Sequence, residues 1–167
     1  EFTDTTVYKS LQDIVEASDT LMITTPDGVI SEVWDCIAGY DLTGKILCHC
    51  SGSLSSNVFS GIEQTGAVGC SIHPMYAFSD RFTSYQNFST AYLVAEGMPA
   101  AYEPLAQMFR ELGHTVLYLR AENKVKYHAA AAMVSNDMIA LFQTVLDLLE
   151  QCGFAREDSV GLLRPLV

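Results

Sequence analysis

Between residues 19 and 120 the sequence alternates short apolar segments with stretches of helical periodicity. The strand-length segments are "DTLMITTPD" (19–27), "KILCHCSG" (45–52), "GAVGCSIHPM" (66–75), "STAYLVAEG" (89–97) and "HTVLYLR" (114–120). The helix-length stretches are 9–17, 28–39, 53–64 and 99–112. Helices that connect consecutive strands impose right-handed crossovers, so this order predicts an α/β fold with a mainly parallel sheet.

The pattern changes after residue 120, where one long helix is predicted over 122–152 and ends at Gly153. A further helix is predicted to begin within "REDSVGLLRPLV". This change indicates two domains, a sheet domain over 1–120 and the first helices of a helical domain over 121–167.

The long helix carries apolar residues on more than one face, among them Met133, Met138, Ile139, Leu141, Phe142, Val145, Leu146 and Leu149. A helix that is apolar nearly all round needs packing partners on several sides. We therefore expect a homodimer formed through the helix 122–152.

The charge balance of 20 acidic against 9 basic residues gives a formal net charge of -11, which repels phosphate backbones and anionic membrane surfaces. Nucleic acid is therefore not expected as a partner. The five cysteines are odd in number and form no C-x-x-C pair, which favours reduced thiols and the cytoplasm. The apolar runs of the long helix are interrupted by "SND" short of the roughly 20 residues that span a bilayer, so no membrane partner is expected.

Polar residues follow three consecutive predicted strands, as "TTPD" (24–27), "CSGS" (50–53) and "HP" (73–74). In open α/β sheets, ligands bind at the carboxyl ends of strands, so these residues are expected to converge on one crevice. The turn Ser51-Gly52-Ser53 precedes a predicted helix, where backbone N–H groups attract a carboxylate or phosphate. The alternative is that Ser53 only caps that helix.

Two further groups of residues allow a structural and a functional interpretation. Cys48 and Cys50 alternate with His49 along one strand, which favours buried thiols over a metal site, and no metal ligand set is predicted. His73 precedes Pro74 at a strand end, where its imidazole could point into the crevice or bond a backbone carbonyl.

In the segment "KVKYHAAAAMVSND" (124–137), a regular helix places one set of residues on one face: His128, Ala132, Ser135, Asn136 and Ile139. The alanines leave open space beside His128 and Asn136. Either a second helix or a ligand could fill that space.

The motifs "TTPD", "HCSGSLSS", "SIHPMYAF", "KYHAAAAMVSN" and "RPLV" occur in an order that resembles a known family. It is that of the Rossmann-like NADP oxidoreductases with an added helical domain of unknown function, relatives of pyrroline-5-carboxylate reductase in the 6-phosphogluconate dehydrogenase-like superfamily. The sequence contains no G-x-G-x-x-G turn. The resemblance thus implies a partial Rossmann-like fold, lacking its first β-α-β unit and followed by the start of an all-helical domain, in a chain truncated at both ends.

The resemblance also implies roles for individual residues. NADP, or NAD, would contact Thr25, Pro26, Ser51 and Gly52, and a small-molecule substrate would contact Ser53 and Ser135. The catalytic candidates are His128, Asn136 and His73. β-Hydroxyacid dehydrogenases of the superfamily carry a lysine four residues before the asparagine, where this chain has Ala132, so His128 is expected to transfer the proton instead.

These implications lead to three hypotheses. The first is an NAD(P)-dependent oxidoreductase acting on a small carbonyl, imine or hydroxy-acid substrate. The second is a non-catalytic dimer that binds a nucleotide or metabolite, and the third is a structural fragment without a ligand.

Overall fold

The structure, a computed structural model, describes residues 5–166. The chain divides into two compact units, residues 1–127 and 128–167. The boundary lies inside helix α4 (Lys124–Ala132), somewhat beyond the change of sequence pattern near residue 120. It lies there because the first turn of α4 is bonded to the sheet unit through Lys124 and Tyr127.

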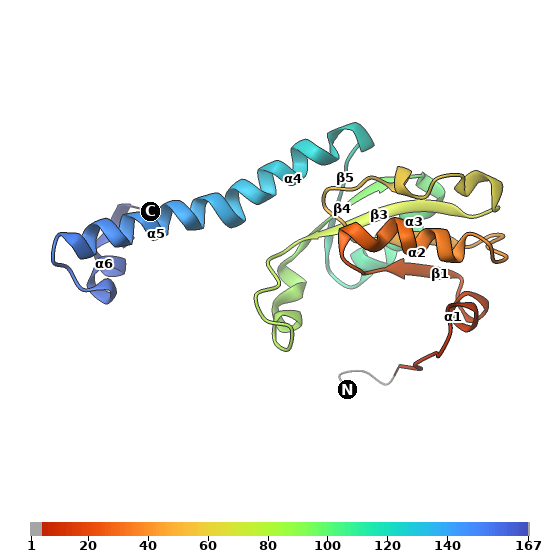
Figure 1. The fold of residues 1–167 in the computed structure, drawn as a ribbon, viewed down its shortest axis with the longest axis horizontal. Coiled ribbons are helices and arrows are strands. Elements are labelled where there is room, and N and C mark those ends of the chain that lie inside the picture. Colours follow the sequence, from red (N-terminus) through yellow and green to blue (C-terminus); the bar gives the residue numbers. More distant parts are fainter. Residues whose placement is uncertain (1–4, 167) are drawn as a thin grey trace. The chain divides into compact units, whose positions relative to one another are not determined.

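The first unit is built on a five-stranded sheet in the order β1-β2-β3-β4-β5 (Figure 1). Its strands are β1 (Thr20–Ile23), β2 (Ile46–His49), β3 (Val68–Met75), β4 (Tyr92–Gly97) and β5 (Thr115–Tyr118). The pairs β1–β2, β2–β3 and β4–β5 are parallel, and β3–β4 is antiparallel. The predicted α/β class with a mainly parallel sheet is therefore confirmed.

The antiparallel pair has a simple cause in the connection between its strands. Residues 76–91 contain only a 3₁₀ segment (Ser84–Thr90) and no crossover helix, so the chain turns back beside β3. The last residues of β3, including Pro74, pair with β4 but have no partner on β2. A proline is tolerated at such an unpaired edge because it has no N–H to donate.

Helices cover the sheet on both faces. Successive residues of β2 belong to different cores, Leu47 to one and Cys48 to the other, because side chains alternate across a strand. One core includes α2 (Ile30–Ile37), which buries Ile30, Trp34 and Ile37 at helical spacing. The other includes α3 (Pro99–Glu111). A short helix α1 (Leu11–Ala17), capped by the Ser10 hydroxyl, precedes β1.

The prediction of a helix over 53–64 is wrong. The structure has two 3₁₀ turns there, Ser56–Val58 and Ile62–Gln64. The backbone N–H and the hydroxyl of Ser56 both donate to the buried Glu96 carboxylate, each over 2.8 Å, which diverts this segment from helical bonding. Phe59 then packs against Gly69, where an added Cβ would lie 2.9 Å from the ring.

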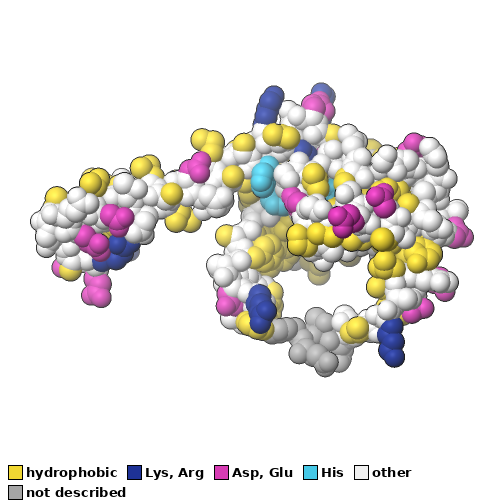
Figure 2. Space-filling view, viewed as in Figure 1, with side chains coloured by type: hydrophobic (Ala, Val, Ile, Leu, Met, Phe, Trp, Pro, Cys, Tyr) yellow, Lys and Arg dark blue, Asp and Glu magenta, His cyan; other side chains and the backbone are white. Residues whose placement is uncertain are grey.

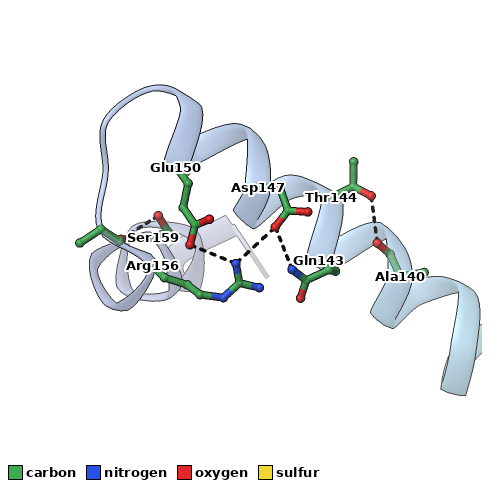
Figure 3. Close-up of polar contacts among 8 residues, drawn as sticks. Ala140, Gln143, Thr144, Asp147, Glu150, Arg156 and Ser159 are labelled. Atoms are coloured by element: carbon green, nitrogen blue, oxygen red, sulfur yellow. Dashed lines mark hydrogen bonds and ion pairs between the residues drawn. The ribbon is translucent and has the colours of Figure 1, made fainter.

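The second unit contains one long helix and a short return. Helix α4 continues through a π turn (Met133–Asp137) into α5 (Met138–Gln151), and α6 (Arg156–Leu163) follows. Gly153, at φ 91°, lies in the turn between α5 and α6. Arg156 joins α6 to α5 through ion pairs with Asp147 (3.3 Å) and Glu150 (3.1 Å) (Figure 3).

Hydrophobic side chains line the surface of the long helix on more than one side (Figure 2). The exposed ones are Val125, Met133, Val134, Met138, Ile139, Leu141, Phe142 and Leu148. Because the helix runs on through Ser135–Asp137, the stretch Ala121–Gln151 (31 residues) is long and apolar enough, by length and composition, to cross a membrane. The two apolar runs on either side of "SND" thus belong to one continuous helix, as predicted over 122–152, but the break between them does not keep this helix below the length and apolar content of a membrane span.

Candidate functional site

The turn after β2 is organised by one hydroxyl and one carboxylate. The hydroxyls of Ser51 and Ser53 each donate to Asp27 Oδ2 over 2.7 Å. Ser51 Oγ in turn accepts the N–H groups of Ser53 (3.1 Å) and Leu54 (2.9 Å). Asp27 follows β1, so two of the three strand ends that were predicted to converge, 24–27 and 50–53, meet here.

This arrangement corrects both interpretations of the turn. No α-helix follows Ser53, so there is neither a helix for it to cap nor a helix dipole to attract an anion. The N–H groups of Ser53 and Leu54 are used by Ser51 Oγ. The turn therefore offers hydroxyl groups and the Asp27 carboxylate, which suit a ligand that carries hydroxyl or amide groups rather than phosphate.

Beneath the turn lies His49, which is fully buried. Its Nδ1 accepts the N–H of Ser51 over 3.2 Å, and its Nε2 lies 3.3 Å from the carbonyl oxygen of Ser55. One neutral tautomer with the proton on Nε2 satisfies both contacts. Burial lowers the pKa of His49, which favours this neutral form. His49 thus supports the turn from below.

Lys124 is the main residue that sequence reasoning missed. Only 1% of it is exposed, and its Nζ donates to the carbonyl oxygen of Ser51 over 2.7 Å. Burial lowers the pKa of Lys124, while the negative charges of Glu96 and Asp27 oppose that shift. No sequence signal separates it from the exposed Lys126, except that it lies four positions before His128 on the same helix.

Glu96 on β4 is a second residue that the sequence did not indicate. It is buried and accepts hydrogen bonds from Ser56 and, over 3.2 Å, from the Ser71 hydroxyl. It lies at the wall of a cleft of about 630 Å³. The cleft is lined by Ser56, Asn57, Glu96, Gly97, Met98, Tyr102, Tyr118, Leu119, Arg120, Ala121 and Glu122. Gly97 is required there, because its φ is 122° and a Cβ would lie 2.7 Å from the Cys70 backbone.

His73 lies within β3 and is bonded to a side chain. Its Nδ1 is 2.7 Å from the Tyr127 hydroxyl, and the two rings meet edge to face with centroids 5.5 Å apart. Burial raises the pKa of Tyr127 to about 12, so the phenol keeps its proton at neutral pH. Together with Lys124, this contact fixes the first turn of α4 to the sheet unit.

The cysteines and His49 form no metal site. In the part of the chain that the structure describes, no three His, Cys, Asp or Glu side chains come together as ligands. Cys48 is buried beside Cys70, and this neighbour and burial raise the pKa of the Cys48 thiol. Burial raises the pKa of Cys50 to about 11. Both groups are protonated thiols at neutral pH.

The other predicted site residues belong to the helical unit. His128, Ser135 and Asn136 are exposed, and within described residues 128–166 their side chains make no hydrogen bond. Ser135 and Asn136 lie in the π turn, where the N–H of Met138 bonds the carbonyl oxygen of Met133. The face computed for a regular α-helix therefore does not hold beyond Ala132.

Two domain families match this chain. Residues 2–74 match the Rossmann-like domain, and residues 91–167 match the "Domain of unknown function (DUF2520)". The N-terminal part of the chain thus matches a Rossmann-like domain, and the C-terminal part matches a DUF2520 domain. Among curated protein sequences, none matches it.

Several solved structures share the fold. A protein from Thermotoga maritima is 24% identical with a TM-score of 0.70, and the match covers 87% of this chain and 54% of that one. A reductive aminase from Aspergillus terreus, solved with NADPH and ethyl-5-oxohexanoate, is 16% identical with a TM-score of 0.64, covering 93% and 54%. A variant imine reductase from Myxococcus stipitatus, solved with NAD+, is 17% identical with a TM-score of 0.60, covering 94% and 54%.

These three structures share the fold of this chain, and the Rossmann-like and DUF2520 matches confirm the family resemblance seen in the sequence. This chain spans 54% of the length of each of the three structures. Identities below 25% establish the shared fold, and the chemistry of this chain is argued from its own residues.

Proposed function

We propose that the intact protein is an NAD(P)-dependent oxidoreductase that acts on a small carbonyl, imine or hydroxy-acid substrate. The observation that carries this proposal is the cluster of Asp27, Ser51, Ser53 and Lys124 at the carboxyl ends of β1 and β2. Ligands of open α/β sheets bind at this edge. The similarity to structures solved with NADPH or NAD+ supports a nicotinamide dinucleotide as the cofactor.

The residues of the turn fit the uncharged part of such a cofactor. Asp27 repels phosphate but accepts hydrogen bonds from ribose hydroxyls, and the buried Gly52 allows close backbone approach. Thr25 and Pro26, which are exposed after β1, would line the same edge. A nicotinamide dinucleotide would supply the hydride, and these residues would hold its ribose hydroxyls.

We assign the proton transfer of the reaction to a residue of the helical unit, His128. His128 is exposed, and an imidazole can donate or accept a proton near neutral pH. Asn136 would orient the substrate oxygen or nitrogen, and Ser135, in the same π turn, would contact the rest of the substrate.

We further propose a cytoplasmic homodimer that buries the exposed apolar residues of the long helix. A membrane is the competing occupant for a helix of this length. Asn136 and Asp137 lie at the middle of Ala121–Gln151 and would sit at the bilayer centre, where a charged residue costs about 2.5–3.5 kcal/mol or more. A protein surface can instead bond both side chains, so a second copy is favoured.

The competing function is a non-catalytic dimer that binds a nucleotide or metabolite. It is favoured by Ala132, which stands where related dehydrogenases carry a lysine. NADPH oxidation by the intact protein, measured with a panel of small 2-oxo acids and cyclic imines, separates the two. Ligand-dependent thermal stabilisation without turnover would support the binding protein.

The proton role has its own test in His128→Ala. If His128 transfers the proton, this variant of the intact protein should lose about a hundredfold or more in kcat with little change in NADPH affinity. Lys126→Ala, on the exposed surface of the same helix, is the matched control. An unimpaired His128→Ala enzyme would exclude the role.

A further inference from the structure

The π turn contains Ser135 and Asn136, the two adjacent polar side chains that follow the alanines of the segment "KYHAAAAMVSN". In a π turn the hydrogen bond runs from residue i+5 to residue i, as Met138 N–H to Met133 O does here. One extra residue is thereby accommodated in the turn. Such turns occur mostly as single insertions in α-helices, frequently at functional sites.

The extra residue changes which side chain lies in line with His128. In a regular helix at about 100° per residue, Ser135 would lie about 20° from the direction of His128 and Asn136 about 80° from it. In the π turn, five residues together turn through about the angle that four residues turn through in an α-helix, so each contributes about 80°. Counted onward from Ala132, this brings Asn136 into line with His128 and turns Ser135 about 80° away.

The surface between the two aligned side chains is small and apolar. His128 and Asn136 are eight positions apart, which is about 12 Å or less along the axis. Ala131 and Ala132 lie between them, and neither methyl group reaches far from the helix. The result is a short apolar strip of helix surface with an imidazole at one end and an amide at the other.

We propose that the π turn makes Asn136, rather than Ser135, the partner of His128 in holding a small substrate above these alanines. This inference rests on the proposed function. An imidazole suits the carbonyl, imine or hydroxyl that reacts, and an amide that donates and accepts suits a second polar group such as a carboxylate. The substrate class is therefore a small bifunctional molecule, an oxo or hydroxy acid or an imine with a polar substituent.

Two single-residue deletions in the intact protein test the direction of Asn136 without changing the direction of the rest of the helix. Both ΔVal134 and ΔAsp137 convert the π turn into a regular α turn and leave Met138 onward at its original angle. ΔVal134 keeps Asn136 within about 20° of His128, whereas ΔAsp137 moves it to about 80°. With NADPH and the best substrate among small 2-oxo acids and cyclic imines, ΔAsp137 should lose about a hundredfold in kcat/KM and ΔVal134 less than about tenfold.

Equal activities of two folded deletion variants, whether high or low, would overturn the inference. If either deletion prevents folding, Asn136→Ala and Ser135→Ala decide it, because alignment requires the loss in the first to exceed that in the second by at least about tenfold. A crystal structure of the intact protein with an uninterrupted α-helix over 133–137 would overturn it without reference to activity. An active wild type with an unimpaired His128→Ala variant would instead count against the proton role proposed above.

Discussion

The two units of this chain differ in how far their apolar side chains are buried. The sheet unit buries its apolar residues in two cores, one on each face of the sheet. In the helical unit, only Leu146 and Ser159 are buried among described residues 128–166, while Ile139, Leu141 and Leu148 are more than half exposed. The first unit has the core of an independent domain, and the second presents a surface that requires a partner.

The largest effect is expected in the core of the sheet unit. Trp34→Ala should lower the free energy of unfolding by about 3–5 kcal/mol, because it leaves a cavity beside Phe59. It also removes the bond from Trp34 Nε1 to the carbonyl oxygen of Ser60, 3.1 Å away. Denaturant titration measures this loss. A change below about 1 kcal/mol would mean that this core does not stabilise the unit on its own.

The helical unit should respond to apolar substitutions in assembly rather than in folding. The double variant Ile139→Glu/Leu141→Glu removes two exposed apolar side chains worth about 1.5–3 kcal/mol each when buried in an interface. We expect the dimer dissociation constant to rise at least about a hundredfold, measured by light scattering over a range of concentrations.

Gln151→Glu at the end of α5 is the control for added charge. It should leave the mass unchanged. A wild-type protein that stays monomeric at high concentration would refute the dimer and remove the contrast between the two units.

Lys124 connects the comparison to the site, because it begins the long helix and is buried in the sheet unit. Lys124→Met should cost about 1.5–3 kcal/mol, since the charged hydrogen bond to Ser51 is lost and that carbonyl is left without this donor. The matched variant Lys126→Met should change stability by less than about 0.5 kcal/mol. Equal effects of the two substitutions would contradict the burial of Lys124.

The smallest effect is a pH dependence that belongs to the sheet unit. The folded-state pKa of His49 is lowered by burial, so below its ordinary value of about 6.5 the unfolded chain binds the extra proton more readily. Stability should therefore fall as the pH drops from 7 towards 5, by at most about 1.4 kcal/mol per pH unit for one proton. In the His49→Gln variant, this part of the dependence of stability on pH should disappear. Denaturant titrations at several pH values would measure it.

The sequence by itself determined the order of the strands, the mainly parallel sheet and the long helix, because apolar periodicity records which faces are buried. It also indicated that Ser51 and Ser53 meet the loop after β1, since parallel strands end at the same edge. These features depend on residues close in sequence or on a rule of topology.

Tertiary structure decided the rest. Residues 53–64 form turns instead of a helix because Glu96, forty positions from Ser56, takes up its N–H and hydroxyl. Lys124 is buried and Lys126 exposed because a carbonyl 73 positions away in sequence lies within reach of only one of them. The π turn likewise changes the direction of Asn136 without any signal in the local pattern. In each case the competing interaction comes from a distant residue or from the backbone of the folded helix, and side-chain periodicity carries no information about either.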